Sequence, residues 1–327
     1  MRAPANTEAS NAPTLLLAGP TAVGKSEVAL LLAQQLGGEI VSVDSMQVYR
    51  GMDIGTAKPS AKERALVPHH LIDVVELTEP FDAAQFACLA HVAVKDIQAR
   101  GRVPILCGGT GLYFKAFLEG LGVAPASDAT VRAELESTPL PELLRELAER
   151  DPEAFERIDR QNRRRVVRAV EVIRLTGKPF STQRAKWEHA TRSTQHASAH
   201  FAMSRHSSDL HSRIDHRVEK MFRDGLVAET VRLLERGLDR NRTAMQALGY
   251  RQVMEHLRGV RSLAETIELV KIRTRQFAKR QMTWFRGQMD LTWVEVQPGE
   301  SANATTSKIL KILSTDEHGC DIQDRKI

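Results

Sequence analysis

Residues 19–26 read Gly19-Pro20-Thr21-Ala22-Val23-Gly24-Lys25-Ser26, and they fit the pattern G-x-x-x-x-G-K-[ST] of a phosphate-binding P-loop. The apolar run 14–18 before them predicts a short buried strand, and residues 27–36 after them predict an amphipathic helix that ends at two glycines. A strand before the motif and a helix after it are the context in which this loop binds phosphate. The context favours a true P-loop over an ordinary glycine-rich turn.

In such a loop the backbone N–H groups between the two glycines converge on a phosphate, and a lysine neutralises an outer one. Lys25 is the lysine here, and the Ser26 hydroxyl is placed to ligate Mg²⁺. We therefore predict that all of residues 19–26 bind a diphosphate. The motif does not identify the reaction, because kinases, NTPases and some group transferases bind a diphosphate in the same way.

The composition is that of a globular protein with room for about two domains. The chain has 327 residues, 42% of them hydrophobic, and a net charge of +5 with an isoelectric point near 9.2. The positive charge is concentrated: residues 157–192 contain eleven Lys or Arg and three acidic residues, and residues 271–286 contain six basic residues and no acidic one. Such clusters indicate a polyanion larger than one nucleotide.

Cysteine usage and hydropathy indicate the cellular compartment in which the protein works. Three cysteines are too few for a disulfide framework or a zinc site, which fits a reducing compartment. No run reaches the roughly 18 apolar residues that a membrane helix needs. We expect a cytoplasmic monomer that does not bind membranes.

Apolar runs alternate with helical patterns through the first third of the chain. Predicted strands occupy residues 14–18, 39–43, 71–75 and 103–107, and a helix is predicted over 83–100. This alternation is typical of an α/β fold, here a P-loop NTPase-like parallel sheet covered by helices.

The pattern changes around residue 121, where prolines separate short helical segments. We predict a first part of the catalytic core at residues 12–120 and an inserted helical domain at 121–199. A strand near 200–203 then begins the return to the core, which continues with C-terminal helices over 200–295. Residues 296–327 are predicted to form a tail, of which the residues after about Ser314 are polar and poorly ordered.

Two polar residues follow predicted strands and have two interpretations each. Asp44 is placed to ligate Mg²⁺ through water or to take a proton from a nucleophile, but a turn or helix-capping aspartate has the same position. Thr110 lies in Gly108-Gly109-Thr110-Gly111, a turn that presents a hydroxyl and N–H groups to a diphosphate. Turn chemistry alone also explains these residues.

Arginines form a second group of candidates. Arg213 and Arg217 are four residues apart on a predicted helix, where they are able to bind a leaving diphosphate together. Taken without context, each is better explained as part of a solvated helix face. The segment 163–168, Arg163-Arg164-Arg165-Val166-Val167-Arg168, is amphipathic if helical. Nucleic-acid binding explains its charge better than a merely solvated surface does.

Taken together, these residues resemble the bacterial tRNA dimethylallyltransferase family, also called tRNA isopentenyltransferases. The matching segments follow the family order between about residues 14 and 293. They are residues 19–26, 44–49 (Asp44-Ser45-Met46-Gln47-Val48-Tyr49), 51–59 (Gly51-Met52-Asp53-Ile54-Gly55-Thr56-Ala57-Lys58-Pro59), 108–113, 213–217, 249–252 and 274–281. The pairing of 44–49 with 51–59 is especially specific, because P-loop kinases in general lack it.

The resemblance implies transfer of a dimethylallyl group from dimethylallyl diphosphate to the exocyclic 6-amino group of the adenosine just 3′ of the anticodon, in tRNAs that read codons beginning with U. The P-loop would then hold the prenyl diphosphate rather than ATP. Asp44 would act as general base toward the weakly nucleophilic amine. The departing diphosphate would be stabilised by Lys25, Thr110, Mg²⁺ on Ser26 and an arginine of the Arg213/Arg217 pair.

The resemblance also assigns the insert to the anticodon stem-loop. Residues that match tRNA-contacting positions of the family are Asp44, Ser45, Met46, Gln47, Thr110, Arg132, Arg164, Arg165, Val166, Val167, Arg168, Arg275, Lys279 and Arg280. The target base must leave its stack to react, so we expect a channel through the protein. One departure affects the register of these contacts: residues 160–163 replace a Pro-Asn-Asp turn that is frequent in the family.

Three alternatives explain less of the sequence. A small-molecule P-loop kinase uses residues 19–26 but leaves the basic insert and the Asp44 motif without a role. An adenylate isopentenyltransferase shares the core chemistry but has little need of the basic clusters. A noncatalytic RNA-binding module needs no P-loop.

Overall fold

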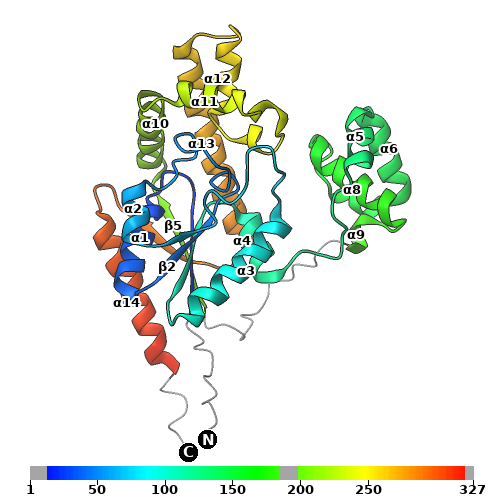
Figure 1. Ribbon diagram of the computed structural model, residues 1–327. Helices are drawn as coiled ribbons and strands as arrows, with labels where there is room; N and C mark the ends of the chain where they lie inside the picture. Colours follow the sequence, from blue (N-terminus) through cyan, green and yellow to red (C-terminus); the bar gives the residue numbers. More distant parts are fainter. Residues whose placement is uncertain (1–12, 184–197, 321–327) are drawn as a thin grey trace, which may run out of the picture. The chain divides into compact units, whose positions relative to one another are not determined.

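A parallel six-stranded sheet forms the centre of the larger of two units in this computed structural model, which describes residues 13–183 and 198–320 (Figure 1). Its strands are β1 (Thr14–Ala18), β2 (Glu39–Val43), β3 (His69–His70), β4 (Pro104–Gly108), β5 (Ser198–Arg205) and β6 (Thr292–Val296). The strands predicted at 14–18, 39–43 and near 200–203 are confirmed, and the strand predicted at 103–107 lies one residue further along.

The order of the strands is β3-β2-β4-β1-β5-β6, and every neighbouring pair is parallel. Ala18 at the end of β1 pairs with Gly108 of β4 and with Ala202 of β5. The chain leaves β1 for β2 on one side, whereas β5 lies on the other side. The carboxyl end of β1 therefore lies at a change of direction in the sheet, where open α/β folds bind ligands.

Helices surround this sheet, as the alternating pattern predicts. Outside the insert they are α1 (Lys25–Leu36), α2 (Ala61–Leu66), α3 (Ala83–Ala99), α4 (Gly111–Glu119), α10 (Ser207–Arg223), α11 (Leu226–Glu235), α12 (Tyr250–Leu257), α13 (Leu263–Gln288) and α14 (Ala302–Cys320), with short 3-10 turns η1 (Leu238–Arg240) and η2 (Ala244–Gln246). In the described part of the chain, none of the helices combines the length and apolar character needed to cross a membrane.

Alternating side chains of the buried strands pack on the two faces of the sheet. Leu15 and Leu17 of β1 join one buried cluster with Val28 and Leu32 of α1, while Leu16 between them points to the opposite face. In Figure 1, α1 and α14 lie on one side of the strands and α3 and α4 on the other. The result is a three-layer core that places the carboxyl ends of the strands beside the P-loop.

The prediction of a strand at residues 71–75 is wrong. β3 ends at His70, and Leu71 and Asp73 adopt left-handed backbone conformations with φ of +61° and +56°. A strand cannot continue through such residues. Leu71 and Ile72 are nevertheless buried, so their apolar character reflects core packing outside the sheet.

The smaller unit, Leu118–Ala190, is helical in its described part, which ends at Gln183. Its helices are α5 (Ala129–Ser137), α6 (Leu140–Arg150), α7 (Pro152–Arg157), α8 (Arg163–Thr176) and α9 (Phe180–Gln183). They enclose a core of their own that includes Leu135, Leu143, Leu147 and Val170. The predicted insert, residues 121–199, ends inside β5, because that strand begins at Ser198, and residues 184–197 lie outside the described residues.

The prediction of a tail over residues 296–327 is wrong for its first part. β6 includes Val296, and α14 follows and packs against α1. Ile309 on α14 is fully buried in the same cluster as Leu32. Tertiary burial of a few apolar residues therefore orders a segment whose composition is polar, while residues 321–327 lie outside the described residues.

Ile309→Ala should lower the free energy of unfolding by about 2 to 5 kcal/mol, because it removes buried methyl and methylene groups from the α1–α14 contact. Lys311→Ala on the exposed side of α14 is the matched control and should change it by less than about 0.5 kcal/mol. Urea unfolding curves measure both values. Equal stability of the two variants would show that α14 does not belong to the core.

Candidate active site

The P-loop joins the end of β1 to the start of α1. Gly24 precedes α1 with φ of +105°, a conformation that a residue with a side chain rarely adopts, and Ala22 is also left-handed, with φ of +63°. The chain thus turns sharply before the first turn of α1, where N–H groups have no partner within the helix. Such N–H groups and the helix dipole favour an anion here.

Two arginines bind the carbonyl side of this loop. Arg205 Nε donates to the carbonyl oxygen of Val23 at 2.8 Å, and Arg213 Nε donates to that of Ala22 at 2.9 Å. Arg205 also forms a 2.8 Å ion pair with Asp209. With its carbonyl oxygens held by arginines, the loop has a positively charged support that favours an anionic ligand.

The structure therefore separates the roles of Arg213 and Arg217, which sequence reasoning treated as a pair. Arg213 is exposed, and it binds the loop through the Ala22 carbonyl oxygen. With Glu27, Val28 and residues at the start of α14, it lines a depression of about 170 Å³. Sequence reasoning missed Arg205. Its place at the carboxyl end of a predicted strand was the available signal.

Lys25, Arg217 and Asp44 form the charged centre of the site, and each is half-buried. Burial lowers the pKa of Lys25, the Arg217 charge lowers it further, and Cys107 and Asp44 oppose the change. Burial also lowers the pKa of Arg217, against the attraction of Asp44. Two partly desolvated cations beside one carboxylate are better stabilised when a dianionic ligand is present.

Lys25 is held in this place by two backbone contacts. Its Nζ donates to the carbonyl oxygen of Pro20 at 3.1 Å, and the thiol of Cys107 on β4 donates to the carbonyl oxygen of Lys25 at 3.7 Å. Burial raises the pKa of the Cys107 thiol to about 11, so it stays protonated at neutral pH. A ligand phosphate would compete with the neutral Pro20 carbonyl for the hydrogen bond of the Lys25 ammonium.

Asp44 has the turn role that the sequence left open. Its Oδ1 accepts from the N–H groups of Met46 at 2.8 Å and of Gln47 at 3.3 Å. Both bonds go to one oxygen and fix the carboxylate plane, which leaves Oδ2 available to a proton donor in the described structure. A turn aspartate and a general base are therefore compatible here.

Thr110 lies beside Asp44. Its Oγ1 accepts from the N–H of Ser45 at 3.2 Å, and its own N–H donates to the carbonyl oxygen of Val43 at 3.2 Å. Gln47 is bound on the other side of this turn, where Ser42 donates to its side-chain oxygen at 2.8 Å. These bonds place Asp44 and Thr110 at adjacent strand ends.

The segment 51–59 is held by charged groups from distant parts of the chain. The buried carboxylate of Glu229 accepts from the N–H groups of Ile54 at 2.9 Å and of Gly55 at 3.3 Å, and Tyr250 donates its hydroxyl to the same carboxylate at 2.6 Å. The Lys58 ammonium, with a side chain only 1% exposed, forms 2.6 Å ion pairs with Asp53 and Asp73. This motif thus supports the turn that follows Asp44.

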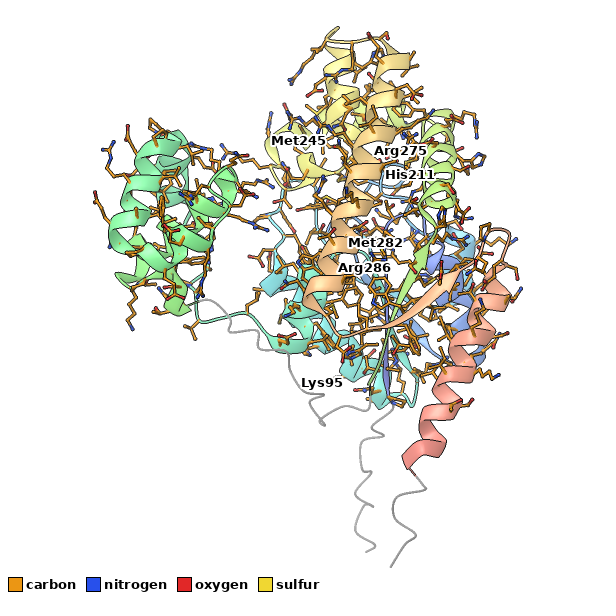
Figure 2. The ribbon with its side chains drawn as sticks, turned by 180° about the vertical axis from the view of Figure 1, so that it is seen from behind. Lys95, His211, Met245, Arg275, Met282 and Arg286 are labelled. Atoms are coloured by element: carbon orange, nitrogen blue, oxygen red, sulfur yellow. The ribbon has the colours of Figure 1, made fainter. Side chains whose placement is uncertain are left out.

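The predicted tRNA-contacting residues of α13 differ in their surroundings. Arg275 forms an ion pair with Asp215 of α10, whereas Lys279 and Arg280 are exposed. Figure 2 shows Arg275 and Arg286 along the same helix. Lys279 and Arg280 are therefore better placed than Arg275 to meet an RNA phosphate.

The predicted residues of α8 separate in the same way. Val166 and Val167 are buried in the core of the insert, so their side chains pack there, and their contact with tRNA stays a prediction. Arg168 binds the buried Glu171 at 2.8 Å, and Arg132 binds the same carboxylate at 2.9 Å.

Two arginines of this group remain on the outer side of α8. Arg164 and Arg165 are both exposed. Their exposure makes them the strongest RNA-contact candidates among the predicted residues of the insert.

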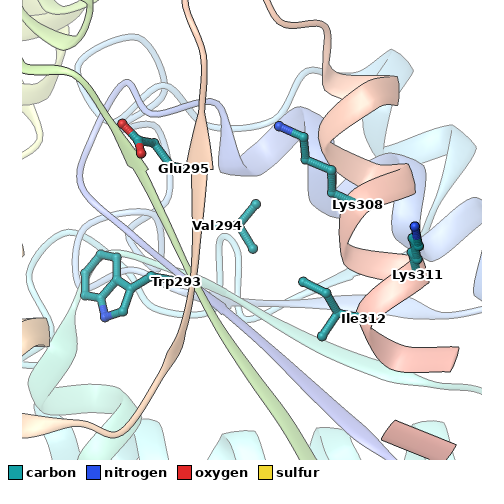
Figure 3. Close-up of a pocket in the computed structure, with 6 residues that line it drawn as sticks. All are labelled: Trp293, Val294, Glu295, Lys308, Lys311 and Ile312. Atoms are coloured by element: carbon teal, nitrogen blue, oxygen red, sulfur yellow. The ribbon is translucent and has the colours of Figure 1, made fainter. Parts of the chain in front are cut away.

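A separate groove lies between β6 and α14 (Figure 3). It has a volume of about 320 Å³ and is lined by Trp293, Val294, Glu295, Lys308, Lys311 and Ile312. None of the predicted site residues lines it, and its Lys308 forms a 2.7 Å ion pair with Glu300.

Comparisons with known proteins agree with one another. A protein-family model described as IPP transferase matches residues 47–288. The chain is 46% identical over 284 residues to tRNA dimethylallyltransferase 1 of Trichlorobacter lovleyi (86% of this chain, 92% of the relative), and 48% identical over 285 residues to the tRNA dimethylallyltransferase of Halorhodospira halophila (85% and 91%).

Solved structures give the same result. The crystal structure of the tRNA isopentenylpyrophosphate transferase from Bacillus halodurans superposes with a TM-score of 0.69 at 37% identity, covering 93% of this chain and 96% of that one. A eukaryotic dimethylallyltransferase, described as acting on tRNA, superposes with a TM-score of 0.75 at 26% identity, covering 94% and 80%.

The charged centre should bind inorganic pyrophosphate, and Lys25→Ala should weaken that binding about 10- to 100-fold, because a charge-assisted hydrogen bond contributes about 1.5 to 3 kcal/mol. Isothermal titration calorimetry measures the affinity. Lys62→Ala, on the exposed surface of α2, is the control and should bind like the wild type. Equal affinities for the two variants would contradict a phosphate role for Lys25.

Proposed function

The chain belongs to the IPP transferase family and is a tRNA dimethylallyltransferase, and we propose that residues 19–26 hold the dimethylallyl diphosphate that it uses. We propose as acceptor the exocyclic 6-amino group of the adenosine just 3′ of the anticodon, in tRNAs that read codons beginning with U. One observation carries the proposal: Lys25, Arg217 and Asp44 come together beside the P-loop, so that one site offers both diphosphate-binding cations and a base.

In the proposed reaction the amine nitrogen attacks the allylic carbon while the bond from that carbon to the diphosphate oxygen breaks. The electron pair of that bond leaves with the diphosphate, and Lys25 and Arg217 stabilise the growing negative charge. Asp44 takes the proton from the nitrogen as the new bond forms. The N–H groups of Met46 and Gln47 hold the Asp44 carboxylate during this transfer.

We propose Mg²⁺ as the cofactor. Ser26, in the first turn of α1, supplies a hydroxyl oxygen, and Mg²⁺ prefers a few oxygen ligands together with substrate phosphates. Within residues 13–183 and 198–320, no group of three or more His, Cys, Asp or Glu side chains is arranged to hold a metal by itself. The ion would neutralise charge on the diphosphate when bound.

The charge distribution favours tRNA over free adenylate as the acceptor. Lys279 and Arg280 on α13, and Arg164 and Arg165 on α8, are exposed basic residues that a nucleotide acceptor does not require. Mass spectrometry of tRNA incubated with the protein, Mg²⁺ and dimethylallyl diphosphate tests the acceptor directly. The monomeric state and the cytoplasmic location remain predictions.

Asp44→Asn should lower the single-turnover transfer rate by about 10²-fold or more and leave tRNA affinity within a few fold, because the amide keeps the turn bonds but cannot take a proton. Asp44→Ala should be as slow and also less stable. Rapid-quench kinetics and filter binding measure the two quantities. A near-normal rate for Asp44→Asn would mean that the aspartate is only a turn residue.

Joint replacement of Arg164 and Arg165 by alanine should weaken tRNA binding and reduce the slope of log K against log salt, by about 0.7 to 0.9 for each arginine–phosphate interaction that the substitutions remove. Affinity for dimethylallyl diphosphate should not change. Arg145→Ala, exposed on α6 of the same unit, is the control. An unaltered slope in the double variant would mean that these two arginines do not contact RNA phosphates and that the basic residues of α13 bind the tRNA.

A further inference from the structure

Gln281 of α13 joins two loops of the active site. Its Oε1 accepts from the N–H of Thr21 in the P-loop at 2.9 Å, and its Nε2 donates to the carbonyl oxygen of Gly109 at 2.9 Å. The side chain is buried, with the residue 8% exposed. Both ends of one amide are thus used to connect the diphosphate loop to the turn that carries Thr110.

The close approach of this amide explains why residue 109 is glycine. A Cβ there would lie 2.3 Å from Gln281 Nε2, closer than any real contact. Thr110, the next residue, binds the backbone on both sides of Asp44 through Val43 and Ser45. A displacement of Gly109 would therefore be transmitted to Thr110 and to the Asp44 turn.

The helix that carries Gln281 is also joined to α10. Arg275 binds Asp215, and Lys271 donates to Glu219 at 2.8 Å. α10 in turn carries Arg213 and Arg217. α13 therefore holds the P-loop, the Thr110 turn and the arginine helix in one arrangement.

We propose that Gln281 is a positioning residue that sets the separation between the bound diphosphate and the Thr110–Asp44 side of the reaction; this inference rests on the proposed function. Its amide acts through Thr21 and Gly109. A misplacement of about 1 Å between reacting groups lowers a rate about 10²-fold. The two hydrogen bonds of the Gln281 amide, to Thr21 and Gly109, are therefore expected to affect the rate. Gln281 does not read RNA, although it ends the segment 274–281, because both of its polar atoms bind loops of the core.

Gln281→Met keeps the length and volume of the side chain and removes both hydrogen bonds. We expect a single-turnover rate about 10- to 100-fold below wild type at saturating substrates, a higher KM for dimethylallyl diphosphate and unchanged tRNA affinity. Gln288→Ala, at the exposed end of α13, is the control and should behave like the wild type, with a similar melting temperature. A Gln281→Met rate within about twofold of the control would overturn the proposal.

Gln281→Glu supplies a signature that a general loss of stability would not produce. A protonated carboxyl donates and accepts as the amide does, whereas the carboxylate only accepts and repels the Gly109 oxygen. The ratio of the Gln281→Glu rate to the wild-type rate should therefore rise as the pH falls from about 8 to about 5, which takes the carboxyl toward its pKa. A ratio independent of pH would overturn the proposal.

Calorimetry with inorganic pyrophosphate separates this inference from the proposed function. If the wild type binds pyrophosphate but transfers no dimethylallyl group to tRNA, the proposed function fails. A weaker pyrophosphate affinity in Gln281→Met would still support the positioning of the P-loop by Gln281. An affinity equal to that of Gln288→Ala would overturn it.

Discussion

The parallel register of β2, β4 and β1 is the constraint on which the site depends. Because Gly108 pairs with Val43 on one side and with Ala18 on the other, these three strands end at the same level of the sheet. The residues that follow them are then necessarily neighbours: the P-loop after β1, Asp44 after β2 and Thr110 after β4. No single loop contains the site, and a one-residue shift of any strand would separate its parts.

Electrostatics then gives this strand edge its preference for an anion. Lys25 and Arg217 are partly removed from water, and burial lowers the pKa of both. Arg205 and Arg213 add positive charge behind the loop, where they bind its carbonyl oxygens. Asp44 lies beside Lys25 and Arg217, and Asp209 pairs with Arg205, so these two carboxylates offset part of the charge of the four cations. A bound diphosphate would offset the rest. The same positive charge would stabilise the electron pair that leaves with the diphosphate, and so would make the diphosphate a better leaving group.

Local patterns in the sequence predicted the features that depend on residues close together in the chain. The P-loop, β1, β2 and the position of Asp44 and Thr110 at strand ends follow from short apolar runs and glycine-rich turns. The strand prediction for residues 71–75 was wrong because the left-handed backbone at Leu71 and Asp73 ends the strand in spite of the apolar composition of the segment. Long-range contacts account for the features that sequence reasoning missed: Ile309 orders α14, Val166 belongs to the core of the insert, and Arg205 and Gln281 reach the P-loop from distant segments.

The segment 51–59 shows how a sequence motif can be specific to a function without containing a reacting group. Its N–H groups bind Glu229, and Lys58 is enclosed by Asp53 and Asp73. A buried ammonium without these carboxylates would be strongly unfavourable, so the three charged residues depend on one another. Gln47, three residues after Asp44, donates to the carbonyl oxygen of Thr56 in this segment. The motif therefore fixes the far side of the Asp44 turn, and its link to the chemistry is the orientation of that carboxylate.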